Sequence, residues 1–176
     1  MIRLLLFLGV IAFLCGLSTA ACGASGSTFW DPAGYFSTVV PSHWRLQVSE
    51  SSDSLTVFYG RDTHDLLYVE RLDPVRDETA ADFAERVLSL YQTPYGPQDF
   101  AVLEEPLAAE VGGVTAARVV YEFMGGSNQL VQELRYFVLV GSVGFSITYA
   151  NSEAAFANGL DDLNSVLASW RWLTLE

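Results

Sequence analysis

The sequence predicts an α+β fold in which two amphipathic helices pack on an antiparallel β-sheet meander. Three observations carry this prediction. Apolar residues alternate with polar ones over several short stretches, which is the period of a β-strand. Glycine-rich turns join the long apolar stretches of the second half. Two other stretches, near 79–92 and 152–169, repeat apolar residues every three or four positions, as an amphipathic helix does.

The first half of the chain contains four predicted strands. A turn at Pro41-Ser42-His43 separates the first two, and a polar turn separates the last two. Asp73-Pro74 is a turn signal that ends the fourth strand. The four strands are expected at 35–40, 44–48, 54–60 and 66–72.

The first helix is expected over about 79–92. Thr79, with Asp82 three residues later, resembles a capping box, in which each side chain bonds to the other residue's backbone N–H. Pro94 stops the helix. Its apolar stripe comprises Phe83, Val87, Leu90 and Tyr91.

The second half is predicted to form a meander of four strands. Gly112-Gly113 is a hairpin signal, because two-residue turns of this kind need positive φ. Turns at 125–128 and 141–142 add two further hairpins, and successive hairpins form an antiparallel sheet. The strands are expected at 100–111, 114–124, 129–140 and 143–150.

Alternation within the last three strands predicts which side chains share a face. Charged residues such as Glu133 and Arg135 fall on mixed faces beside apolar Phe137. One face of the sheet is therefore expected to be deeply buried and the other only partly buried. The apolar faces comprise Thr115, Ala117, Val119, Tyr121 and Phe123; Leu134, Tyr136, Val138 and Val140; and Val143, Phe145, Ile147 and Tyr149.

The second helix is expected over about 152–169, with Asn151 or Ser152 as its N-cap. After it, Trp170 and Trp172 alternate as in a short final strand or a packed tail. The apolar stripe of this helix comprises Phe156, Leu160, Leu163 and Leu167.

Residues 1–21 have the layout of a secretory signal peptide. Arg3 precedes an apolar run at 4–14, and small residues follow at 18–21. The run is short for a membrane span, which needs about 20 apolar residues, and a retained signal anchor is the alternative. The chain is therefore expected to leave the cytoplasm.

Cys22 directly follows two alanines, which resembles the bacterial lipobox, whose cysteine becomes the lipidated first residue. Thr19 stands where that motif prefers leucine, and ordinary cleavage near Ala21 is the alternative. Residues 22–30, which are rich in Gly and Ser at 23–27, are then expected to be a flexible tether. Residues 31–176 are expected to form a single domain.

The charge and the cysteine content of the chain argue against nucleic-acid binding, disulfide bonds and cysteine-based zinc sites. Loss of Arg3 leaves eight basic residues, all arginine, against 21 acidic residues, and hence a charge of −13. Such a charge repels nucleic acid and anionic lipid headgroups. Cys15 is lost with the signal peptide, so Cys22 cannot form an internal disulfide or a cysteine-based zinc site.

Two groups of side chains are candidates for binding. Asp62, His64 and Asp65 cluster in a predicted turn and could hold a divalent cation, although a polar hairpin loop has the same composition. The tryptophans Trp44, Trp170 and Trp172 could line a groove, and core packing is the alternative for them.

The sequence contains no pattern typical of an enzyme. No G-x-S-x-G elbow is present, and nothing resembles a phosphate-cradling loop or a dinucleotide fingerprint. Neighbouring carboxylates such as Glu104 and Glu105 point apart on a strand, so they do not form an acid–base pair. We therefore expect no catalytic residues and no cofactor.

Several of these features together resemble the PsbP-like and DcrB-like group. They are the turn with Pro41 and Trp44, a helix after the fourth strand, the long meander and the ending Ser169-Trp170-Arg171-Trp172. The resemblance covers about 31–173. It implies an antiparallel sheet between helices, an α/β/α sandwich, and a non-catalytic accessory protein beside a membrane.

The sequence thus favours an exported, lipid-anchored binding or assembly module that acts on a protein partner at a membrane complex. Its anchor would be lipidated Cys22, with a secreted or periplasmic soluble protein as the alternative location. A small-ligand or divalent-cation-binding protein of the cell surface is the alternative function.

Overall fold

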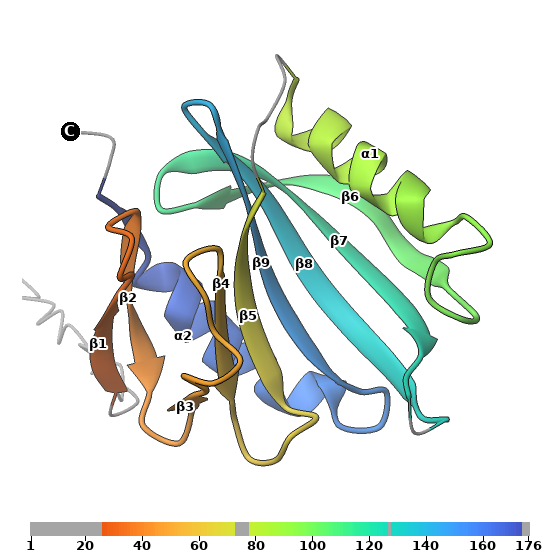
Figure 1. Cartoon of the computed structure of the whole chain (residues 1–176), viewed down its shortest axis with the longest axis horizontal. Coiled ribbons are helices and arrows are strands. Elements are labelled where there is room, and N and C mark those ends of the chain that lie inside the picture. The colour runs from red at the N-terminus through yellow and green to blue at the C-terminus, as the bar shows by residue number, and fades with distance from the viewer. Residues whose placement is uncertain (1–25, 73–77, 127, 174–176) are drawn as a thin grey trace, which may run out of the picture.

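The computed structural model describes residues 26–72, 78–126 and 128–173, which form two antiparallel sheets and two helices (Figure 1). The large sheet has the strand order β3-β4-β5-β9-β8-β7-β6, and the small sheet has the order β1-β2-β10. The strands are β1 (Gly26–Trp30), β2 (Phe36–Pro41), β3 (Arg45–Leu46), β4 (Leu55–Tyr59), β5 (Leu66–Leu72), β6 (Ala101–Val111), β7 (Val114–Met124), β8 (Leu130–Val140), β9 (Val143–Ser152) and β10 (Arg171–Trp172).

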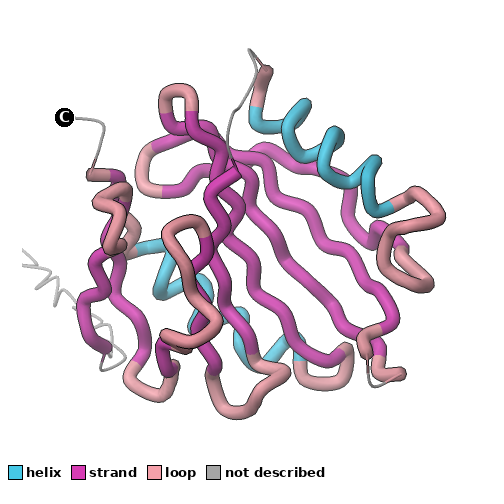
Figure 2. Tube along the Cα trace, viewed as in Figure 1, coloured by secondary structure: helices cyan, strands magenta, loops and turns pink. Residues whose placement is uncertain are grey.

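The helices lie on opposite faces of the large sheet. Helix α1 (Ala80–Tyr91) packs over β6, β7 and β8, whereas α2 (Leu160–Ala168) and the small sheet lie on the other face (Figure 1). Figure 2 shows that strands are the predominant secondary structure and that the helices cover them from the two sides. The predicted α+β fold, with two helices on an antiparallel sheet, is confirmed.

The meander and its hairpins form as predicted, because the local turn signals are strong. β6, β7, β8 and β9 pair in succession, and Gly112 and Gly113 adopt φ values of 57° and 80° at the first turn. A pairing between β5 and β9 then joins the early strands of the large sheet, β3, β4 and β5, to the last strand of the meander. This pairing links segments that are far apart in the sequence.

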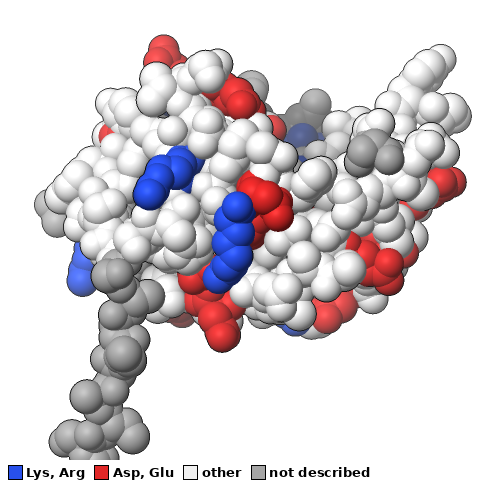
Figure 3. Space-filling view, turned by 90° about the horizontal axis from the view of Figure 1, so that it is seen from below, with Lys and Arg blue, Asp and Glu red and all other residues white. Residues whose placement is uncertain are grey.

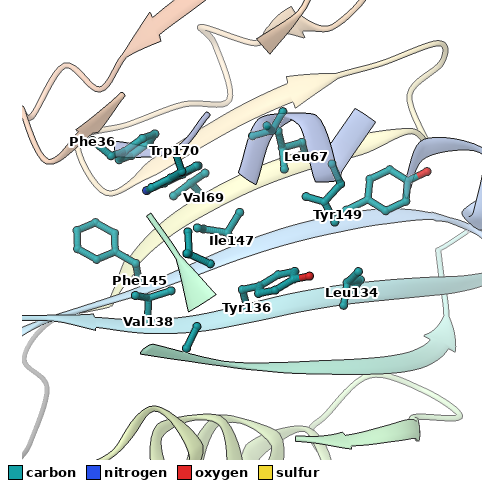
Figure 4. Close-up of a cluster of buried hydrophobic side chains, with 14 of the residues drawn as sticks. Phe36, Leu67, Val69, Leu134, Tyr136, Val138, Phe145, Ile147, Tyr149 and Trp170 are labelled. Atoms are coloured by element: carbon teal, nitrogen blue, oxygen red, sulfur yellow. The ribbon is translucent and has the colours of Figure 1, made fainter. Parts of the chain in front are cut away.

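The larger core lies between the large sheet, α2 and the small sheet (Figure 4). Ile147 and Leu163 are almost completely buried there, and Phe36 stacks on Trp170 with ring centroids 4.3 Å apart. Burying each such large side chain contributes about 1.5–3 kcal/mol. This core fixes α2 and the small sheet against the large sheet.

The smaller core lies under α1. The capping box is present: the Thr79 hydroxyl accepts from the Asp82 backbone N–H, and the Asp82 carboxylate accepts from the Thr79 backbone N–H. Phe83 packs edge-on against Phe137 of β8. Leu90 departs from the predicted stripe, since it is 59% exposed and borders a pocket between α1 and β5 rather than the sheet.

Buried clusters occupy both faces of the central strands, whereas the sequence predicted one partly buried face. Ala117, Val119 and Tyr121 of β7 face α1, while Tyr136 and Val138 of β8 face the opposite core. The second face is covered because α1 packs directly on it.

Part of the predicted tether forms a strand. Residues 26–30 of the expected segment 22–30 form β1, which pairs with β2 from Gly26 opposite Pro41 to Trp30 opposite Ser37. The sequence did not predict this strand because glycine and serine are typical of flexible segments. Phe29 of β1 packs on the larger core and thereby fixes the strand in place. The remaining expected tether residues, including Cys22, and the expected signal peptide lie outside the described residues.

The second helix begins later than predicted. β9 extends through Ser152, so Asn151 and Ser152 belong to a strand rather than to a helix cap. A 3₁₀ turn, η1 (Phe156–Gly159), then leads into α2. A Cβ at Gly159 would lie 2.2 Å from the Tyr149 hydroxyl, so the chain approaches β9 too closely for a larger residue there.

Candidate functional site

A cluster of polar side chains lies on the face of the large sheet that carries α1, at the side of the helix nearest β5. The sheet register creates it: Glu70 of β5 lies opposite Ser146 of β9, and Arg135 of β8 lies opposite Thr148. All four side chains project from the same face, because antiparallel partners do so. Charged groups from three strands are thereby brought together inside the protein.

Arg135 is the centre of this cluster and is only 2% exposed. One of its terminal nitrogens, Nη2, donates to Glu70 Oε2 at 2.5 Å and to Ser146 Oγ at 2.9 Å. The other, Nη1, donates to the hydroxyl of Tyr91 at 2.6 Å and to that of Tyr121 at 3.4 Å. Burial lowers the pKa of Arg135, but the surrounding phenols and Glu70 outweigh burial and raise the pKa above its ordinary value. The guanidinium therefore stays charged.

Glu133, also on β8, is 6% exposed and has phenols rather than a cation as its direct partners. Tyr68 donates to Glu133 Oε2 at 3.0 Å, and Tyr121 donates to the same oxygen. Burial raises the pKa of Glu133, and the bonds from both phenols together with the charge of Arg135 offset only part of that effect. Burial likewise raises the pKa of the Tyr68 and Tyr121 hydroxyls.

Two buried polar atoms of this cluster have no hydrogen-bond partner within the described part of the chain. They are Arg135 Nε and Thr148 Oγ1, on side chains that the register places opposite each other. An unsatisfied buried polar group costs about 1–3 kcal/mol. These two unsatisfied atoms therefore make the cluster less stable than an apolar core of the same size would be.

Two pockets open beside the cluster. The larger, of about 390 Å³, lies between α1 and β5 and includes Glu70, Arg135 and Leu90 among its walls. The smaller, of about 190 Å³, is lined by Tyr68, Tyr91, Pro97, Tyr121, Phe123 and Glu133. Tyr91 borders both pockets.

The candidate cation ligands Asp62, His64 and Asp65 do not converge on a common point. Asp62 Oδ1 accepts from the backbone N–H groups of His64 at 2.8 Å and Asp65 at 3.1 Å. Asp65 is 1% exposed, and its Oδ2 accepts from the Arg61 backbone N–H at 2.9 Å. These carboxylates shape the turn, and no group of three metal-ligating side chains that could hold an ion occurs among the described residues.

The candidate groove tryptophans are core residues instead. Trp44, Trp170 and Trp172 are 5%, 4% and 7% exposed, and all three belong to the larger core. Trp172 Nε1 donates to the Val111 carbonyl at 2.9 Å. The pairing of β10 with β2 places Trp170 and Trp172 in this core. Only an edge of Trp170 borders a surface pocket, beside Gly112.

Sequence reasoning missed the polar cluster as a site. It placed Glu133 and Arg135 on a mixed face, but it could not show that Glu70 pairs with Arg135 across β9. The available signal was a pair of opposite charges two positions apart inside a mostly apolar strand. Strands of that kind bury charges only when other strands supply partners.

The outer surface offers few basic groups. On the face seen in Figure 3, the basic side chains are few and acidic groups lie beside them. Arg61, for example, pairs with Asp65 and with Asp162, at 3.4 Å and 3.2 Å. Within the described ranges, no helix is long and apolar enough to cross a membrane.

No protein-family model matches this chain, and a search of the curated proteins finds no match. Solved structures do match. The solution structure of cyanobacterial PsbP (CyanoP) from Synechocystis has a TM-score of 0.60 and 13% identity, and the match covers 90% of this chain and 98% of CyanoP. LpqN of Mycobacterium tuberculosis, which is involved in cell envelope biogenesis, has a TM-score of 0.59 and 16% identity over 86% of this chain and 87% of LpqN.

A protein from Bacteroides thetaiotaomicron matches 84% of this chain with a TM-score of 0.58 and 15% identity. This chain covers 48% of that protein, or about half its length. Likeness at such low identity concerns the arrangement of the backbone and not the activity. The described chain therefore has the PsbP-like fold, an α+β sandwich that it shares with cyanobacterial PsbP and LpqN.

Proposed function

We propose that this protein is an exported, non-catalytic binding or assembly module that a lipid on Cys22 holds beside a membrane protein complex. The likeness to CyanoP and to LpqN, a protein of envelope biogenesis, supports an accessory role outside the cytoplasm. The acidic composition disfavours nucleic acid as a partner. The partner of this module is a protein at the membrane surface.

The position of β1 is the observation that carries the proposal. The first strand that the structure describes, β1, starts at Gly26, four positions after Cys22. Four residues span at most about 14 Å when fully extended. A lipid on Cys22 would therefore keep the small sheet close to the membrane surface and restrict the directions from which a partner can approach. Without that lipid, the protein would be secreted or periplasmic.

The polar cluster supports binding rather than catalysis. Among the described residues of the cluster, the one aliphatic hydroxyl that is bonded to a carboxylate is that of Ser146, which donates to Glu70 Oε2 at 3.0 Å. Ser146 is completely buried, and Glu70 is already bound to Arg135. A nucleophile must reach its substrate, and this one does not.

The second candidate function is the binding of a small ligand at the cell surface. The two pockets beside Arg135 and Glu133 favour it, because ligand sites are typically concave and apolar with a few convergent polar groups. A divalent cation is less well supported, because the carboxylates of Asp62 and Asp65 accept bonds from the backbone of their own turn.

Photo-crosslinking in intact cells tests the proposed partner. A photoreactive phenylalanine at Tyr95, which is 98% exposed and lies two positions before Pro97 of the smaller pocket, should capture a membrane-complex protein. The same group at Val48, which is 76% exposed beyond β3 at the other edge of the large sheet, is the matched control (Figure 1). Equal capture from the two positions, or none, would contradict the proposal.

A thermal-shift screen with ions and small molecules tests the second candidate function, the binding of a small ligand.

A further inference from the structure

The smaller pocket has walls of unusual composition. The rings of Tyr68, Tyr91 and Phe123 form its partly exposed sides, and buried Tyr121 and Glu133 form its floor. Apart from Pro97, each residue that lines this pocket is aromatic or acidic. Its volume of about 190 Å³ is below the ~300–1,000 Å³ of pockets for drug-sized ligands, so it suits a compact group.

Among the described residues, no cation pairs directly with the Glu133 carboxylate at the floor of the pocket. Arg135 forms its ion pair with Glu70 at 2.5 Å, and the direct partners of Glu133 are two neutral phenols. Both phenols donate to Oε2, so Oε1 receives no hydrogen bond from the described residues. The cluster therefore holds one guanidinium against two carboxylates, and ionised Glu133 leaves it one positive charge short.

We propose that this pocket binds a small, soluble organic cation, a quaternary ammonium group or a fully alkylated amine, between its aromatic rings and above Glu133. The faces of aromatic rings attract cations, and aromatic pockets are a known means of recognising quaternary ammonium groups. Such a group has no N–H, so it needs no hydrogen-bond acceptor and gains from the carboxylate through charge alone. The formal charge of −12 of the whole chain adds a field that attracts cations.

The charged surroundings are compatible with a cation. Arg135 lies behind Tyr91 and Tyr121, whose hydroxyls accept from its Nη1, and Glu70 balances its charge. The titratable groups around Glu133 are these four and Tyr68. Since burial raises the pKa of Glu133, acidification should protonate it and weaken the binding of a cation.

This inference deepens the small-ligand candidate of the proposed function, and it depends neither on lipidation nor on a protein partner. The test uses the whole chain carrying Cys22→Ser, so that no acyl chain of the protein competes for an apolar surface. Its failure would leave the lipid on Cys22 and the crosslinked partner untouched, since those are measured on the native protein.

Isothermal titration calorimetry with tetramethylammonium and choline should give saturable heats, whereas 3,3-dimethyl-1-butanol, the neutral isostere of choline, should give none. Glu133→Gln should weaken choline about 30-fold or more, as expected when one charge of a buried pair is removed. Phe123→Leu should weaken choline roughly two- to fivefold through the loss of one aromatic face. Two control variants should bind choline with unchanged affinity. Glu104→Gln makes the same change of charge on an exposed side chain of β6, and Phe156→Leu removes an aromatic ring that packs on the larger core.

Three outcomes would overturn the inference. They are the absence of heat with millimolar choline and tetramethylammonium, equal binding of the neutral isostere, and unchanged binding by Glu133→Gln. If Glu133→Gln does not fold, the pH dependence of choline binding to the chain with Glu133 intact replaces it, and affinity that fails to fall on acidification contradicts the role of Glu133. Retention on phosphatidylcholine vesicles without binding of free choline would also refute a soluble cation as the ligand.

Discussion

Replacing Arg135 by leucine should destabilise the domain by about 3 kcal/mol. Removal of one partner from a buried ion pair costs about 3–5 kcal/mol, because the other charge is left without compensation. Here the remaining charge is Glu70, whose side chain is 32% exposed, so water can partly replace the guanidinium. The expected loss therefore lies at the lower end of that range. The hydroxyls of Tyr91 and Ser146 lose a donor as well.

Urea unfolding followed by circular dichroism measures this change. A loss of about 3 kcal/mol corresponds to a fall in Tm of about 6–12 °C for a domain of this size. The matched control is Arg118→Leu, which breaks the exposed pair with Glu104 at 2.8 Å and should cost about 0–1 kcal/mol. The double variant Arg135→Leu with Glu70→Leu should lose less than Arg135→Leu alone, because no unpaired charge remains. Equal losses for Arg135→Leu and Arg118→Leu would refute the reasoning.

Three further predictions concern the cores, the helix cap and the buried carboxylate. Leu163→Ala should cost about 2–5 kcal/mol in urea unfolding, because Leu163 is 1% exposed, and Leu163→Asp should prevent folding; a wild-type Tm for Leu163→Asp would contradict the packing of α2. Thr79→Ala should lower the free energy of unfolding by about 1 kcal/mol, because the capping box is lost. A change smaller than the error of the same assay would show that the cap does not stabilise the domain. Because burial raises the pKa of Glu133, the free energy of unfolding should fall as pH rises from about 4 through the raised pKa. Glu133→Gln should flatten this dependence. Identical pH profiles for the two proteins would show that the pKa of Glu133 does not change on folding.

Local patterns were sufficient to predict most of the secondary structure. The hairpin at Gly112-Gly113 and the helix after Thr79 depend on turn and capping chemistry within a few residues, and both form as predicted. β1 was missed because its glycine and serine resemble a tether, and only pairing with β2 makes it a strand. The start of α2 was misplaced because Gly159 packs against Tyr149, a contact that the pattern of leucines does not contain.

The candidate site was harder to predict than the fold, because it depends on strand order. Glu70 and Arg135 meet only because β9, the last strand of the large sheet in the sequence, pairs with both β5 and β8. The aromatic pocket likewise takes Tyr68 from β5, Tyr91 from α1 and Phe123 from β7. The sequence instead drew attention to tryptophans, which the larger core buries. Hydrophobicity alone does not distinguish a core ring from a pocket ring.

The chemical state of Cys22 tests the central claim most directly. Intact-mass and N-terminal peptide mass spectrometry of the native protein, extracted from membranes, would establish where the mature chain begins and what it carries. The account predicts a first residue Cys22 that carries two or three acyl chains. A mature chain that starts at Ala21 or Cys22 with a free amine and no lipid would contradict it.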